Sequence, residues 1–175
     1  MVGFIKSALA ITAVFGLFVG GLAAPAPEPK LVDYLSLIKP GPGLPSPKEL
    51  GLTNEDLNKP IPGLEKLMAR DLLEKRYTPQ CWDQPKCTYS DALGCYNYLY
   101  NLGNTVCEAS GVGRMCYVGS CNWYARSING YSASPCYKAA LGGAWVLRNC
   151  NSGNRLSGSN AAYDNGNLAV DILAG

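Results

Sequence analysis

The chain has 175 residues and a formal net charge of +2 at pH 7, and it contains no histidine. Without histidine, serine and cysteine triads and histidine-based ribonuclease mechanisms are excluded. Residues 77–175 carry six basic and five acidic side chains. This balance argues against nucleic acid as a partner and against binding to anionic membranes by charge alone.

Residues 1–23 are predicted to be a secretory signal peptide. One positive charge precedes an almost unbroken apolar run over 7–21, and small residues follow it, which is the order found in such peptides. Gly21 and Ala23 are small at the two positions that a signal peptidase reads, so we expect cleavage after Ala23. The alternative is a membrane anchor, but the run is shorter than the roughly 20 apolar residues that span a bilayer. We therefore expect secretion without stable membrane insertion.

Residues 24–76 are predicted to be a proline-rich pro-segment or linker that is mostly disordered. The segment has no cysteine and contains nine of the twelve prolines, which restrict the backbone without building a core. Only 63–75 has apolar residues at helical spacing. The adjoining basic pair Lys75-Arg76 resembles the cleavage site of kexin-type proteases, so we expect cleavage after Arg76 and a mature chain beginning at Tyr77.

The eight cysteines all lie in the predicted mature domain, 77–175. In a secreted chain an even number predicts disulfides, here four, although the spacing does not choose among the possible pairings. The chain has no Cys-x-x-Cys pair and no histidine, so we expect no metal site and no cofactor. The half-cystines are Cys81, Cys87, Cys95, Cys107, Cys116, Cys121, Cys136 and Cys150.

Two helices are expected in this domain. The first spans 90–102, capped by Ser90 and ended by Gly103, with a core face that excludes Tyr98 and Tyr100. That face comprises Ala92, Cys95, Tyr96, Leu99 and Leu102. The second follows Ser134 as cap and Pro135 in the first turn, with inward-facing Ala140, Ala144 and Leu147, and its Trp145 is expected in the core. Its Gly142 and Gly143 weaken the helix but permit close packing on strands.

Strands are expected between and after the helices. The runs 105–108 and 114–118 read as a hairpin around 111–113, and 122–128 as a third strand before an Asn129-Gly130 turn. A final pair, 155–159 and 167–173, is placed around Asn165-Gly166, with alternating apolar residues that indicate a half-buried strand. The predicted fold class is α+β: a small disulfide-rich sandwich with two helices packed on one face of an antiparallel sheet.

Carboxylate pairs are what remains for catalysis in a chain without histidine. None of the five in the mature domain lies in a recognisable motif, and Asp91, Asp164 and Asp171 are expected at a helix start, a turn and the solvent face of a strand. We therefore predict no catalytic residue and no enzyme. The five are Asp83, Asp91, Glu108, Asp164 and Asp171.

Aromatic residues are the other candidates for function, because tyrosine and tryptophan suit contacts with sugars or proteins. Trp82, Trp123 and Tyr124 lie in weakly structured stretches and are candidates for a binding surface. The alternative is that they cover the flanks of a small core.

Three motifs resemble a known family: CYNYLYNLG at 95–103, GAWV at 143–146 with Cys150, and GSNAA at 158–162 followed by NGNL at 165–168. They are similar to the WD-like domain of small secreted fungal proteins, over about 81–172. Cysteine use and the final strand also resemble, more loosely, fungal necrosis-inducing effectors and killer-toxin-like proteins. Cys87 and Cys121 are additional to the family's usual cysteines, which implies that they pair with each other.

The resulting hypothesis is a secreted, cysteine-rich, non-enzymatic fungal protein, an extracellular effector or toxin-like binding protein. Its expected partner is an extracellular protein or glycan. A carbohydrate-binding or cell-wall protein is the first alternative, and a small secreted hydrolase is the second.

Overall fold

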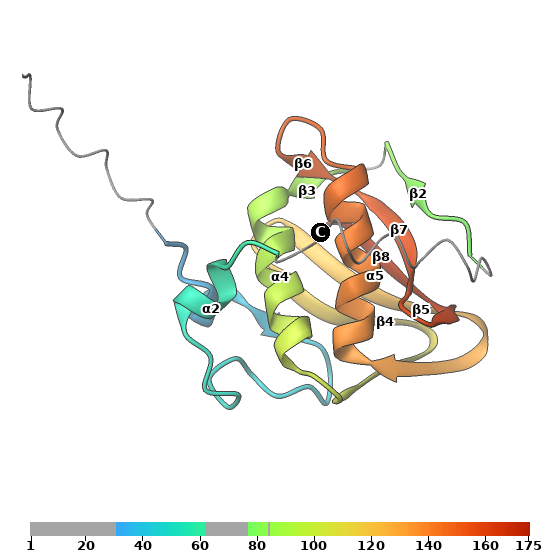
Figure 1. Ribbon diagram of the computed structural model, residues 1–175, viewed down its shortest axis with the longest axis horizontal. Coiled ribbons are helices and arrows are strands. Elements are labelled where there is room, and N and C mark those ends of the chain that lie inside the picture. Colours follow the sequence, from blue (N-terminus) through green and yellow to red (C-terminus); the bar gives the residue numbers. More distant parts are fainter. Residues whose placement is uncertain (1–30, 62–76, 84) are drawn as a thin grey trace, which may run out of the picture. The chain divides into compact units, whose positions relative to one another are not determined.

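A six-stranded antiparallel sheet carries two helices on one face (Figure 1). The computed structural model describes residues 31–61, 77–83 and 85–175. The strand order is β1-β4-β5-β8-β7-β2, and β3 and β6 form a separate two-stranded sheet. The predicted fold class is confirmed. The elements are α1 Tyr34–Leu37, β1 Lys39–Pro40, α2 Asn54–Asn58, β2 Gln80–Cys81, β3 Cys87–Thr88, α4 Tyr89–Asn101, β4 Val106–Val118, β5 Cys121–Pro135, α5 Cys136–Asn149, β6 Arg155–Leu156, β7 Gly158–Ala162 and β8 Asn165–Ala174.

Strands β4 and β5 are longer than predicted because the glycine-containing stretches lie inside them. The expected turn at 111–113 is wrong: Gly111, with φ 108°, is accommodated by a register shift between Ser110 and Val112. The Asn129-Gly130 pair lies inside β5, opposite that irregularity. The actual reversal comes at Gly119, with φ 52°, between Val118 and its partner Cys121. A glycine therefore marked a bulge at one site and a turn at the other.

The turn between the last two strands also comes earlier in the chain than predicted. Asp164, with φ 59°, lies in the turn between β7 and β8, whereas Asn165-Gly166 already belongs to β8. Leu168, Val170 and Ile172 are fully buried as predicted, but the strand is not half-buried, because Ala169 and Asp171 between them are buried as well.

The residues that precede helices α4 and α5 differ by one or two positions from the predicted caps. Thr88, not Ser90, caps α4, and its hydroxyl accepts a hydrogen bond from the Asp91 amide at 3.3 Å. Ser134 lies in β5 and caps nothing, since Pro135 precedes α5 without a side-chain cap. Gly103, with φ 57°, follows α4 as expected.

Two glycines of α5 allow the close packing that the sequence predicted. A Cβ on Gly142 would lie 2.2 Å from the carbonyl oxygen of Ala161, and one on Gly143 would lie 2.1 Å from the ring of Trp123. The helix therefore approaches the sheet more closely than any residue with a side chain would permit.

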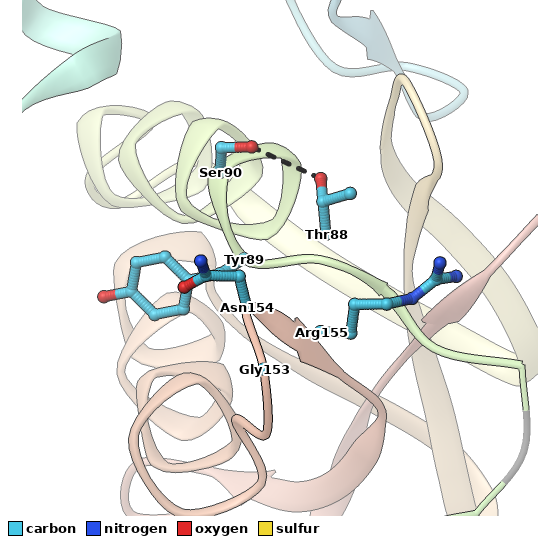
Figure 2. A pocket seen from close by; sticks show the side chains of 6 residues that line it. All are labelled: Thr88, Tyr89, Ser90, Gly153, Asn154 and Arg155. Atoms are coloured by element: carbon cyan, nitrogen blue, oxygen red, sulfur yellow. Dashed lines mark hydrogen bonds between the residues drawn. The ribbon is translucent and has the colours of Figure 1, made fainter. Parts of the chain in front are cut away.

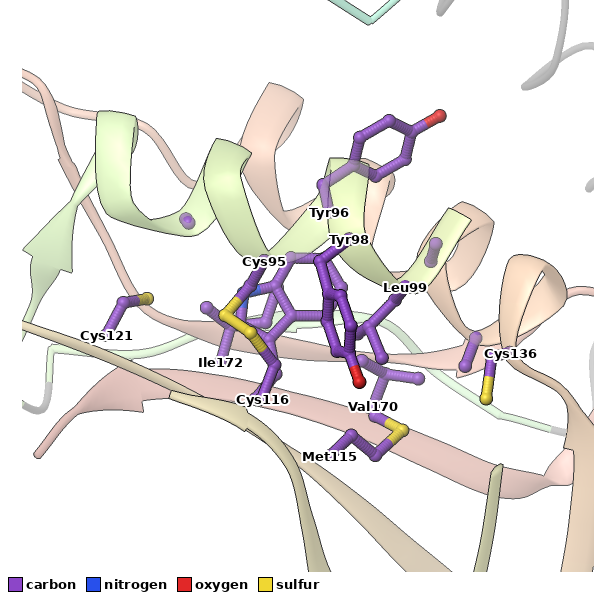
Figure 3. Close-up of a cluster of buried hydrophobic side chains, with 14 of the residues drawn as sticks. Cys95, Tyr96, Tyr98, Leu99, Met115, Cys116, Cys121, Cys136, Val170 and Ile172 are labelled. Atoms are coloured by element: carbon purple, nitrogen blue, oxygen red, sulfur yellow. A yellow bond between two sulfur atoms is a disulfide. The ribbon is translucent and has the colours of Figure 1, made fainter. Parts of the chain in front are cut away.

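Four disulfides connect the elements, and no cysteine is free. The pairs are Cys81–Cys150, Cys87–Cys121, Cys95–Cys116 and Cys107–Cys136. The pairing of Cys87 with Cys121, implied by the resemblance, is present. Figure 3 shows Cys95–Cys116 joining α4 to β4 among Tyr98, Leu99 and Val170. Four disulfides indicate an oxidising compartment, as expected for a secreted protein.

Residues 31–61, here called the strap, contradict the prediction of a mostly disordered pro-segment over that range. The strap contains α1, β1 and α2, and its side chains Tyr34, Ile38 and Leu57 belong to the buried core. Proline kept these elements to a few residues each, but it did not prevent individual side chains between the prolines from packing. The strap also buries Tyr98 of α4, which was expected to point away from the core.

Several predictions lie outside the described residues: the signal peptide, the cleavage after Ala23, the helix over 63–75 and the Lys75-Arg76 pair. Within the described ranges, no helix is long and apolar enough to cross a membrane.

Candidate functional site

The five carboxylates of residues 77–175 occupy separate places and have structural partners. Asp91 accepts hydrogen bonds from the amide and hydroxyl of Ser120, both at 2.8 Å. Asp164 pairs with Lys138 at 3.3 Å, Glu108 accepts from the hydroxyl of Tyr131, and Asp83 lies 4.0 Å from Lys86. Glycoside hydrolysis requires two carboxylates that share a substrate cavity. None of these contacts brings two of the five carboxylates together.

Asp171 differs from its prediction, because it is buried instead of facing solvent. Its residue is 7% exposed, and its two oxygens accept from Arg126 Nε at 2.6 Å and Nη2 at 3.0 Å. Ser159 donates a further hydrogen bond to it, and the hydroxyl of Tyr77 bonds with that of Ser159 at 2.6 Å. Hydrogen bonding to Asp171 raises the pKa of the Arg126 guanidinium above its ordinary value. The network satisfies a charge on a central strand, which explains why a carboxylate is tolerated there.

A hollow of about 500 Å³ lies where the start of α4 meets the turn before β6 (Figure 2). Several of its polar groups are used within the fold. The Tyr89 amide donates to the carbonyl of Asn154 at 2.8 Å, and Arg155 Nε donates to the carbonyl of Lys86 at 3.0 Å. Thr88 and Ser90 are hydrogen-bonded to each other at 3.3 Å. The hollow thus combines one cation with two hydroxyls that are bonded to each other, and none of its lining residues is acidic.

The predicted aromatic surface is not one surface. Trp123 is fully buried, so its assignment to a binding surface is wrong: alternation along β5 turns it inward, against α5. Trp82 and Tyr124 are half-buried but belong to different parts of the sheet, since β8 and β7 separate β5 from the edge strand β2 that precedes Trp82. Trp145, expected in the core, is also half-buried.

Tyr124 has different neighbours, which the register of the sheet brings to it. On β4, Arg114 is paired with Tyr124, and Tyr117 follows three residues later. The ring of Tyr117 lies 5.7 Å from the guanidinium carbon of Arg114 and 5.5 Å from the ammonium nitrogen of Lys39, within the range of cation–π attraction. We call Lys39, Arg114, Tyr117 and Tyr124 the tyrosine–arginine face. Of these four residues only Tyr124 was predicted from the sequence, because cross-strand pairing has no local signal.

A family model described as a domain of unknown function, DUF8794, matches residues 74–174. The chain belongs to this family. No curated protein and no solved structure matches it. The DUF8794 domain therefore includes the four disulfides and both long helices, and it excludes the strap.

The contact between strap and DUF8794 domain is rich in buried tyrosine. The hydroxyl of Tyr34 donates to the carbonyl of Ser90 at 2.6 Å, and that of Tyr98 donates to the carbonyl of Pro45 at 2.7 Å. Burial, reinforced by the charge of Asp91, raises the pKa of Tyr34 to about 12. Burial likewise raises the pKa values of Tyr96 and Tyr98. All three phenols are thus held in their neutral form.

These shifts predict a loss of stability in alkali. A raised pKa means that the folded chain keeps a proton which the unfolded chain releases, so the stabilisation is complete below about pH 10 and falls as the pH rises towards 12. Each such tyrosine contributes roughly 1 kcal/mol per pH unit in that window. Urea unfolding at pH 8 to 11 is expected to show this decline in the free energy of unfolding. In a Tyr34→Phe/Tyr98→Phe variant the free energy of unfolding is expected to decline less steeply with pH. An equal slope in both proteins would contradict the assignment.

Proposed function

We propose that this chain is a secreted, non-enzymatic binding protein, an extracellular effector or toxin-like protein of a fungus. The observation that supports this most is the tyrosine–arginine face. Tyrosine and arginine are enriched at protein interfaces and among the residues that contribute most binding energy. Here they are presented by the two longest strands of the sheet. The expected partner is a protein or glycan outside the producing cell.

Disulfides support the same proposal, because they join the sheet to both long helices at Cys95–Cys116 and Cys107–Cys136. A rigid surface loses little conformational entropy on binding. The resemblance to WD-like, necrosis-inducing and killer-toxin-like proteins supports an effector or toxin role, and the separate structural partners of the carboxylates support a non-enzymatic one.

The test uses the full chain purified from the medium of a secreting host. It is applied to plant leaf tissue and to competing fungal cells, with binding and cell death or growth arrest as readouts. We expect a response that is lost after reduction of the disulfides. The variant Arg114→Ala/Tyr124→Ala is expected to weaken binding at least about tenfold. The variant Tyr131→Ala, at an exposed tyrosine of β5 outside this face, serves as the matched control.

Three results would contradict the proposal. Equal binding by both variants would exclude the tyrosine–arginine face. Binding to chitin or to a glycan array without any cellular response would favour a cell-wall protein. Release of reducing sugar from wall polysaccharide by the purified chain would show a hydrolase.

A further inference from the structure

We propose that the surface formed by α4 and the edge of β4 is a binding surface for the strap, and that the two stay associated without a covalent link when the chain is cut between them. The processed protein is then a two-chain molecule. Residues 31–175 make up a single structural unit, although the family match covers only 74–174.

The first support is backbone pairing. Strand β1 pairs with the C-terminal end of β4, with Lys39 opposite Tyr117 and Pro40 opposite Cys116. The amide of Gly41 then donates to the carbonyl of Met115 at 2.8 Å. A Cβ on Gly41 would lie 1.9 Å from the carbonyl oxygen of Arg114, so only glycine permits this approach. The strap thereby pairs with the last part of an edge that would otherwise be open there to another chain.

The second support is a seat for Tyr34 in the DUF8794 domain itself. A Cβ on Gly94 would lie 2.9 Å from the Tyr34 ring, so the ring rests on the place where α4 lacks a side chain. Glycine inside a helix is unfavourable by comparison with alanine. Gly94 is therefore explained by the strap and not by the helix that contains it.

The third support is a set of buried polar contacts to the strap backbone. The side-chain amide of Asn97, a residue 5% exposed, donates to the carbonyls of Leu57 at 2.9 Å and Lys59 at 2.8 Å. Tyr98 donates to Pro45 on the same side of α4. Together with the fully buried side chain of Leu57, these contacts hold the strap against α4 at several separate points.

After cleavage the strap and the DUF8794 domain have no covalent cross-link, because the strap contains no cysteine. Every cysteine of the chain lies within 81–150 and is paired there, so no disulfide reaches the strap. Packing and hydrogen bonds alone must then hold it after cleavage.

The experiment cuts the folded full chain in vitro at a protease recognition sequence that replaces Lys75-Arg76. The product is run on a gel-filtration column in native buffer, and then in guanidinium without reductant. We expect the strap and the domain to elute together in native buffer at micromolar concentration and separately in guanidinium. Separate elution in native buffer would overturn the proposal, because it would show that the strap dissociates from the domain after cleavage.

Variants test whether the described contacts are responsible. Leu57→Ala and Gly94→Ala are each expected to raise the dissociation constant of the cut complex at least about tenfold. Leu37→Ala, at a strap leucine that is 43% exposed, is the matched control and is expected to leave it unchanged. Gly94→Ala improves helix propensity, so weaker strap binding by a domain that still folds would identify the Tyr34 seat. Unchanged binding in Leu57→Ala and Gly94→Ala would overturn the assignment.

Discussion

Loss of the Cys95–Cys116 disulfide is expected to lower the free energy of unfolding by about 3–5 kcal/mol. Both half-cystines are fully buried, and they join α4 to β4 in the centre of the core. Replacing both with alanine removes the cross-link from the unfolded chain and also leaves unfilled space beside the helix. Guanidinium unfolding of the double alanine variant measures the loss.

The Cys81–Cys150 bridge provides the comparison, because it closes a longer stretch of chain at a less buried place. Its sequence separation is 69 against 21 for Cys95–Cys116, and Cys81 is exposed. An account based only on loop length makes the longer bridge worth roughly 1 kcal/mol more. We expect the reverse order because packing around Cys95 adds to the loss. A larger effect at Cys81–Cys150 would show that chain entropy dominates.

Breaking the Arg126–Asp171 pair is expected to cost about 2–4 kcal/mol when the cation is removed. In Arg126→Met the carboxylate of Asp171, whose side chain is 10% exposed, is left without its counter-charge. Adding Asp171→Asn is expected to recover part of this loss, since the amide keeps an acceptor for Ser159 and carries no charge to desolvate. Thermal and urea unfolding of the single and double variants provide the measurement.

A surface pair is the control for that experiment. Lys138 and Asp164 are 3.3 Å apart, with side chains 25% and 55% exposed, so Lys138→Met is expected to cost less than about 1 kcal/mol. A double variant Arg126→Met/Asp171→Asn that is less stable than Arg126→Met would refute the explanation by a buried unpaired charge.

The sequence was most informative where a structural signal is local. Helix α4 was found from its periodicity and from Gly103, and the buried Leu168, Val170 and Ile172 of β8 from their spacing. Glycine was ambiguous, because the same residue type makes a turn at Gly119 and a bulge at Gly111. Only the pairing of β4 with β5 distinguishes the two.

The candidate site was less predictable, because it is made by contacts between distant segments. Trp123 and Tyr124 are neighbours in the sequence, yet one is buried and the other half-exposed. Strand direction and register decide this, as they decide that Arg114 lies beside Tyr124. Asp171 was misplaced for the same reason: its partner Arg126 lies 45 residues away, on the neighbouring strand.

By itself, the sequence determined the number of disulfides, the oxidising compartment that they indicate and the two-helix, antiparallel-sheet architecture. Composition, an even cysteine count and short-range periodicity carry that information. Only the tertiary structure decided the complete disulfide pairing, the register of the sheet and the role of the strap. The strap was missed because proline content limits regular secondary structure, whereas burial of Tyr34 and Leu57 depends on a complementary surface more than thirty residues further along the chain.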